Sequence, residues 1–424
     1  MSDPVNGATV GGRGARVLLV SAWQTVNIGD VAHTPGAIRA LTELAGHTVA
    51  LWPRRLGSRE RALLGRRFPG TRVLDDARDT GERLTDQLRA TFAWADVCVH
   101  GSGPSIVGAQ QIDLWRRHTR KPYGFFGVTV DPLVPYGDTL ERSRRIVRAI
   151  DGDVLAGEDR ERLGHASFVW CRDSLTVDFL AGQGVGGQVA FGPDAALAAD
   201  VDDEEAADRF LAETGVRPGR FLAVVPRLRH TPYHLLRDDG RSASEVRRDA
   251  INAGWVDNDL GLLREVVTAW LRQTDEDVVI VPEMSYAVGL ALERLDTWPA
   301  DVAGRVRVLP RFWDLGEAVA VYRRATALLS MECHSPLVAM GAGTPALYLR
   351  QSTDTVKGQM FADLGVGDRV HELDVARPEI VLDGLLALRS ADARARTGAV
   401  AGEALTRLAG MARAVVPTPL AEPL

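Results

Sequence analysis

Lysine is almost absent from this chain of 424 residues: Lys121 and Lys357 are the only two, and arginine supplies the other basic side chains. The net charge of −6 argues against a protein that binds nucleic acid through a large basic surface. The sequence contains no run of eighteen apolar residues and no cationic, apolar leader at its start. We therefore expect a cytoplasmic protein without a membrane span.

Cysteine is also scarce. Cys98, Cys171 and Cys333 show no CxxC spacing, so they predict neither a zinc site nor a disulfide framework. Cys98 in DVCVHG and Cys171 in FVWCRD are typical of small residues on buried strands. No other pattern of metal ligands is evident, and we predict neither a metal nor a resident cofactor.

Short apolar runs alternate with helical segments along the chain, from ARVLLVSA (15–22) to PALYL (345–349). Such alternation predicts parallel sheets that are covered by helices on both faces. The pattern pauses at an acidic, alanine-rich segment and resumes with FLAVVP (221–226).

These features predict an α/β fold with two Rossmann-like domains whose parallel sheets face a central cleft. The first domain is expected at 15–200, after a disordered tail at 1–14. A linker helix (201–218) leads to the second domain at 219–395. The remaining segment, 396–424, is expected to form a C-terminal helix and tail that pack back on the first domain.

In such sheets ligands bind beyond the carboxyl ends of the strands, near helix N-termini. After the first strand, TVNIGDVAH places Asn27, Asp30 and His33 at this edge, and Gly29 allows the backbone to approach a ligand closely. Asp30 or Thr34 is the expected cap of the helix that follows. The same residues are also ordinary for a strand-to-helix turn, so both interpretations stay open.

Two further strand ends in the first domain carry candidates. In HGSGPS, Ser102 lies between two glycines, and Ser102 and Gly103 are expected to expose backbone N–H groups to an anion or a sugar hydroxyl. Tight packing explains the two glycines equally well. Arg172 follows FVWC and is suited to grip a carboxylate or phosphate. The alternative is a salt bridge to Asp173 or to another carboxylate; Asp173 or Ser174 is also the expected helix cap.

The second domain repeats this arrangement. VVPRLRH places Arg227 and Arg229 directly after its first strand, which favours an anion site over a solvated loop. Glu283 follows the strand DVVIV.

The stretch SMECHSPLVAMGAGTP (330–345) has a Glu-Cys-His triplet between a strand and a helix. Ser335 is the expected cap of that helix and Pro336 lies in its first turn. The helix N-terminus would lower the proton affinity of His334, whereas Glu332 would raise it. A lone histidine is more often structural.

Taken together, these stretches resemble the polysaccharide pyruvyl transferase family. The resemblance is carried by NIGD, HGSGPSI, WCRDSLTVDFLAGQGV, GPDAAL (192–197), LLSMECHSPLVAMGAGTPALYL and KGQMFADLGV (357–366), in this order over roughly residues 16–370. It implies two domains of the glycosyltransferase B type. It also implies that the pyruvyl group of phosphoenolpyruvate (PEP) is transferred to a saccharide as a ketal.

By the same resemblance, Arg172 would bind the anion of the donor, His334 would be the acid/base group and Lys357 would add positive charge near the phosphate. The family usually has Arg-x-His where this chain has Glu332-Cys333-His334, which reverses the local charge. The arginines that could compensate are Arg227, Arg229, Arg311 and Arg350.

The sequence thus predicts an enzyme, a pyruvyl transferase acting on a small-molecule donor and a saccharide-type acceptor. The alternatives are a nucleotide-sugar-dependent glycosyltransferase or epimerase, and a non-catalytic family member. A homo-oligomer is compatible with the sequence. We assign catalysis to His334 and Glu332, and substrate binding to a set of mostly strand-end residues: Arg172, Arg227, Arg229, Lys357, Asn27, Asp30, His33, Ser102, Gly103, Glu283 and Ser335.

Overall fold

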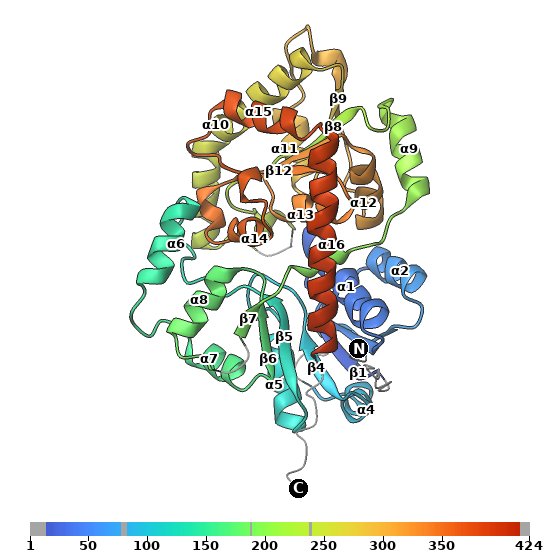
Figure 1. Ribbon diagram of the computed structural model, residues 1–424, viewed down its shortest axis with the longest axis vertical. Helices are drawn as coiled ribbons and strands as arrows, with labels where there is room; N and C mark the ends of the chain where they lie inside the picture. Colours follow the sequence, from blue (N-terminus) through green and yellow to red (C-terminus); the bar gives the residue numbers. More distant parts are fainter. Residues whose placement is uncertain (1–13, 78–82, 187–188, 237–239, 416–424) are drawn as a thin grey trace, which may run out of the picture.

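The structure is a computed structural model that describes residues 14–77, 83–186, 189–236 and 240–415. Two domains follow one another along the long axis of the molecule, and each has a parallel sheet flanked by helices (Figure 1). The α/β fold with two Rossmann-like domains is therefore confirmed.

The first sheet has the strand order β3-β2-β1-β4-β5-β6-β7, and all its neighbouring strands are parallel. Every residue of β4, β5 and β6 is buried, as expected for strands covered on both faces. The strands are β1 (Arg16–Ser21), β2 (Thr48–Pro53), β3 (Arg72–Val73), β4 (Val97–His100), β5 (Tyr123–Val128), β6 (Phe168–Cys171) and β7 (Val189–Phe191).

The second sheet has the order β10-β9-β8-β11-β12-β13 and is also parallel. In both sheets the first strand lies between the second and the fourth, which is the order of doubly wound nucleotide-binding folds. The strands are β8 (Phe221–Val225), β9 (Asp277–Ile280), β10 (Val306–Val308), β11 (Ala327–Ser330), β12 (Ala346–Arg350) and β13 (Val370–Glu372).

The helices connect successive strands and cover both faces of the sheets. They are α1 (Ile28–Arg39), α2 (Ser58–Arg67), α4 (Asp86–Trp94), α5 (Ala109–His118), α6 (Leu140–Ala149), α7 (Gly157–Gly164), α8 (Ser174–Gly182), α9 (Glu204–Thr214), α10 (Ala243–Gln273), α11 (Ala287–Arg294), α12 (Leu315–Arg324), α13 (His334–Gly341), α14 (Gln359–Asp363), α15 (Pro378–Ala387) and α16 (Ala391–Arg413).

The helix caps differ in part from the prediction. Asn27 caps α1, because its side-chain oxygen accepts the N–H groups of Gly29 and Asp30; neither Asp30 nor Thr34 does so. Asp173 caps α8 as expected. The prediction for Ser335 was wrong: this residue lies inside α13, which has no side-chain cap.

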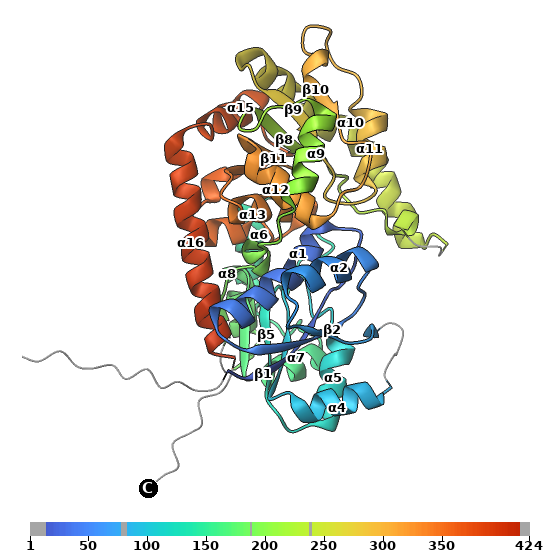
Figure 2. The same cartoon turned by 90° about the vertical axis from the view of Figure 1, so that its right-hand side faces the viewer.

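The last helix, α16, joins the two domains. It runs alongside the second domain and reaches the first, as the two perpendicular views show (Figures 1 and 2). There the Nε2 atom of His47 lies 2.8 Å from the carbonyl oxygen of Ala412, and Arg413 donates to the carbonyl oxygen of Leu44. The helix begins at Ala391, before residue 396. Among the described residues, no helix is long and apolar enough to span a bilayer.

The packing of α1 yields a stability prediction. A Cβ atom at Gly36 would lie 1.8 Å from the carbonyl oxygen of Ala195, so Gly36→Ala should destabilise the protein by about 1–3 kcal/mol although alanine favours helix. Gly65 on α2 has open space around its Cβ position, and Gly65→Ala should stabilise the protein by up to ~1 kcal/mol. Urea unfolding of both variants measures the difference; equal effects would contradict the packing of α1.

Candidate functional site

The two domains meet at the start of α1. The N–H of Ile28 donates to the carbonyl of Glu283 at 3.0 Å, and the N–H of Ser285 donates to the carbonyl of Val26 at 2.9 Å. These bonds connect the turn after β1 to the segment after β9. Strand ends from both sheets therefore contribute to one site.

Gly29 allows this close approach. A Cβ atom at this position would lie 2.4 Å from the Cβ of His334 and 2.8 Å from Oε1 of Glu283. The glycine in NIGD thus makes room for two side chains of the second domain.

Arg172 and Asp194 form a buried ion pair at the centre of the site. Nη1 of Arg172 donates to Oδ2 of Asp194 at 2.7 Å, and its Nε donates to Thr129. Burial alone would raise the pKa of Asp194, but His33 and Arg172 hold it well below its usual value. Asp194 is therefore an anion, and Arg172 pairs with it instead of with Asp173.

Two histidines share this carboxylate. Nε2 of His33 lies 3.3 Å and Nε2 of His334 lies 3.8 Å from Asp194, and the two rings meet edge to face with centroids 4.9 Å apart. On its other side, Nδ1 of His334 lies 3.8 Å from Oε1 of Glu283. The second oxygen of Glu283 accepts the N–H of Ser335 at 2.7 Å. Glu283 thus faces His334 from the segment after β9.

The surroundings of His334 favour its protonated form. Burial lowers the proton affinity of the ring, but the Cys333 sulfur and the carboxylates of Glu283 and Asp194 together raise the pKa of His334 well above its ordinary value. Both ring nitrogens face hydrogen-bonding groups, since Nε2 also lies 3.0 Å from Nη1 of Arg172. A guanidinium only donates, so Nε2 faces a donor in Arg172, and Nδ1, which faces the Glu283 carboxylate, is the nitrogen placed to carry a proton.

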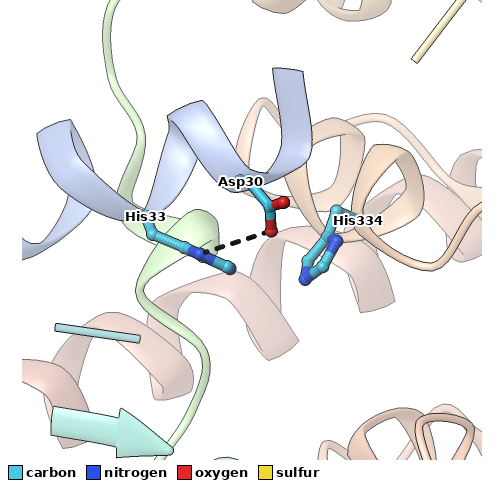
Figure 3. A group of neighbouring side chains, drawn as sticks. All are labelled: Asp30, His33 and His334. Carbon is cyan, nitrogen blue, oxygen red and sulfur yellow. Dashed lines mark ion pairs between the residues drawn. The ribbon is translucent and has the colours of Figure 1, made fainter. Parts of the chain in front are cut away.

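Asp30, His33 and His334 also form a set of metal-ligand types, and their ligand atoms lie within 4.8 Å of one another (Figure 3). Such a set of imidazole and carboxylate groups suits a transition metal. However, the Arg172 guanidinium beside His334 would repel a divalent cation placed on that ring.

A second buried charge network continues from Glu332. The Arg227 guanidinium donates to Asp354 and has its Nε 3.4 Å from Oε2 of Glu332. Asp354 also accepts the Tyr348 hydroxyl at 2.6 Å, and Nζ of Lys357 lies 3.6 Å from it. Two cations, Arg227 and Lys357, therefore meet two acidic groups, Glu332 and Asp354, and Glu332 is only two residues from His334 in the chain.

The neutral form of Glu332 is favoured in this network. Burial raises its pKa to about 8 despite the opposing charge of Arg227, with Glu283 and Asp354 adding to the rise. A protonated carboxyl carries no charge and donates a hydrogen bond. The replacement of the usual arginine by Glu332 therefore removes a positive charge without adding a negative one below about pH 8.

Of the four arginines that could compensate for the replacement at position 332, Arg227 is the one that lies next to Glu332. The other three candidates for compensation are engaged elsewhere: Arg229 by Asp259 and Asp374, Arg311 by Glu317, and Arg350 by Glu372. Arg229 also stacks on Trp255, with 3.9 Å between the guanidinium carbon and the ring centroid. The charge of Arg229, which was predicted to bind substrate, is thus balanced by Asp259 and Asp374.

The prediction for Ser102 and Gly103 also needs correction. Their groups are buried and already bonded: the Ser102 hydroxyl donates to the carbonyl of Phe126, and the N–H of Gly103 donates to the carbonyl of Gly127. These residues hold the loop after β4 against β5. The N–H of Gly103 and the hydroxyl of Ser102 are therefore already occupied by protein partners.

Sequence reasoning missed the two anions that organise the networks. Asp194 lies in GPDAAL, which contributed to the family resemblance without a role for its acidic residue, and Asp354 lies in the loop after β12. The sequence does carry one signal for Asp194: it is a single aspartate in an otherwise apolar stretch, and a charged residue in such a stretch is buried only when it is paired.

A sequence comparison decides the family. The family profile described as polysaccharide pyruvyl transferase matches residues 27–353, which is more than half of the chain. The chain belongs to this family. It is a transferase of the kind that modifies polysaccharides. No curated protein was matched by sequence.

Solved structures confirm the glycosyltransferase B fold. MnaA of S. aureus, solved with UDP, is similar with a TM-score of 0.54 and 12% identity over 93% of this chain and 94% of that one. UDP-GlcNAc 2-epimerase from Methanocaldococcus jannaschii gives 0.52 and 10%, covering 88% and 93%. The glycotransferase of kitacinnamycin gives 0.50 and 13%, covering 95% and 98%. At these identities the likeness concerns the fold alone.

The central ion pair yields the second prediction. Asp194→Asn leaves Arg172 buried without its counter-ion, so it should destabilise the protein by about 3–5 kcal/mol. The control Asp30→Asn changes the same group at a partly exposed position that does not contact Arg172, and should cost much less. Urea unfolding at neutral pH compares them. A similar loss in both variants would contradict the central place of Asp194.

Proposed function

We propose that this enzyme transfers the pyruvyl group of PEP to two hydroxyls of a saccharide, forming a ketal and releasing phosphate. One observation carries the proposal. Two of the buried guanidinium nitrogens that have no hydrogen-bond partner among the described residues lie at this site: Nη2 of Arg172, beside His334, and Nε of Arg227, beside Glu332. Unpaired buried donors are costly, and an anionic donor substrate would satisfy both.

The donor would bind between these cations. Arg172 and Arg227 offer planar donors suited to carboxylate and phosphate, and Lys357 adds a charge that Asp354 holds in place. Asp194 and Asp354 neutralise part of this charge, so the site can exist without its substrate. Binding of the PEP anion would neutralise the positive charge that remains in the site without substrate.

His334 is suited to start the reaction. It would give its proton to the methylene carbon of PEP, which turns the C=C bond into a methyl group on an electrophilic carbon. The first sugar hydroxyl adds to that carbon and returns a proton to His334. The C–O bond to phosphate then breaks, and the second hydroxyl closes the ketal. Its proton leaves with phosphate, so atoms and charges balance.

Glu332 would support this sequence as a neutral donor. In its protonated form the Glu332 carboxyl can donate a hydrogen bond to an oxygen of PEP without repelling PEP, and Arg227 supplies the positive charge. This arrangement replaces the family's arginine by two residues.

The third prediction concerns His334. His334→Gln should lower the kcat of PEP-dependent phosphate release by about 10²–10⁴-fold, because it removes the general acid. PEP should still raise the thermal midpoint of this variant, since the arginines remain; His118→Gln, at an exposed histidine on α5, should behave as wild type.

The assay uses PEP with a panel of saccharides, and thermal unfolding is repeated with UDP-, GDP- and TDP-sugars. Stabilisation by a nucleotide sugar with none by PEP would overturn the pyruvyl proposal in favour of a nucleotide-sugar enzyme.

The fourth prediction uses the titration of Glu332. Its raised pKa means that the folded protein keeps a proton which the unfolded chain has already lost, so Glu332 makes stability fall as the pH rises toward about 8. Above that pH its carboxylate would also repel PEP. Glu332→Gln should raise the thermal midpoint at neutral pH and abolish the weakening of PEP binding between about pH 7 and about pH 9. A variant with the same pH dependence as wild type would rule out this role.

A further inference from the structure

A pocket of about 510 Å³ lies between the domains, next to the charge networks. Its walls include Trp23 and Asp30 from the segment around the start of α1, Arg54 and Arg55 after β2, and Tyr233 from the short helix η3 (Tyr233–Leu236) of the second domain. This volume falls in the range of small-molecule sites.

The pocket is adjacent to the reaction centre. Asp30 belongs to both, since it lines the pocket and its carboxylate lies near His33 and His334 (Figure 3). Tyr233 gives a second connection. Partial burial and then Asp30 raise the pKa of its hydroxyl, while the charge of Lys357 opposes them. A molecule in the pocket would therefore reach the groups assigned to the donor.

The walls combine two kinds of side chain. Trp23 is held by a hydrogen bond from its Nε1 to the carbonyl of Ser102 at 2.6 Å and stacks on His100. Tyr233 offers a large ring with 41% of its surface exposed. Rigid aromatic groups with a polar tip suit the mixed apolar and polar surface of a sugar ring. Asp30 can accept hydrogen bonds from sugar hydroxyls.

The arginines set the charge of the ligand. Within the described parts of the chain, neither Arg54 nor Arg55 lies within ion-pair distance of a carboxylate, in contrast to Arg172, Arg227 and Arg229. Arg54 is fixed at the wall because its Nη1 donates to the carbonyl of Val107. Two neighbouring cations that have no counter-ion in the described ranges provide a binding site for an oxyanion.

We infer that this pocket binds the acceptor and that the acceptor is an anionic saccharide, whose phosphate or carboxylate group is held by Arg54 and Arg55. This inference rests on the proposed function for its assignment of the acceptor. The anion would lie on the β2 side of the pocket. The sugar hydroxyls would then lie on the Asp30 side, toward His334.

The test compares glucose 1-phosphate, glucuronate and UDP-glucose with neutral glucose by calorimetric titration of the full chain. The three anionic ligands should bind at least about tenfold more tightly than glucose. Arg54→Gln/Arg55→Gln should remove this preference. Arg59→Gln/Arg66→Gln, which deletes two exposed arginines on α2 outside the pocket, should keep it.

The single variant Arg55→Gln, at an exposed side chain, should weaken anion binding even if the double variant folds poorly. Equal affinities for glucose and glucose 1-phosphate, or unchanged binding by the Arg55 variant, would overturn the inference. Tighter binding of UDP-glucose than of glucose 1-phosphate would support it and assign the anion to a nucleotide diphosphate.

PEP is tested separately with the same proteins. The Arg54/Arg55 variants should keep their thermal stabilisation by PEP, because the donor groups are unchanged. Loss of the anion preference with intact PEP binding would thus support the acceptor pocket. Absence of PEP binding in wild type would instead count against the proposed function alone.

Discussion

The buried carboxylate of Asp194 is the anion on which the proposed reaction centre depends. It accepts a hydrogen bond from Arg172 and lies within ion-pair distance of His33 and His334. Removing such charges from water costs several kcal/mol for each ion, and this cost is offset only when the partners are in place. Because His334 belongs to the second domain and the others to the first, the same carboxylate links the electrostatics of the site to the contact between the domains.

Burial also determines the charge of the glutamate at position 332. In water this side chain would be an anion, and its place beside the proposed PEP site would be unfavourable. In the structure the charges of Glu283 and Asp354 add to the effect of burial, and together they raise the pKa of Glu332 to about 8, which favours its protonated form at neutral pH. Arg227 then restores the cation from the end of β8. The charge of the site is therefore a property of the network and cannot be read from one position.

The position of residues along the strands could be predicted from the sequence, but their partners could not. The carboxyl ends of parallel strands meet at one edge of each sheet, and these two edges face each other, which is why His334 of the second domain lies near both Arg172 and Glu283. The two-domain α/β fold followed from the same alternation. By contrast, Ser102 also follows a strand, yet its loop is covered by β5 and the segment after β7. Whether a side chain after a strand end faces the ligand site or the core depends on tertiary packing, and the spacing of residues in the sequence does not encode that packing.

The start of α1 shows why NIGDVAH forms one functional unit. Asn27 satisfies the first free N–H groups of the helix, and Gly29 leaves room for His334 and Glu283. Asp30 and His33 are three residues apart, so they project from the same side of the helix. One faces the pocket and the other faces Asp194. A single helical turn therefore joins the proposed acceptor pocket to the proton network, and neither domain alone contains the complete site.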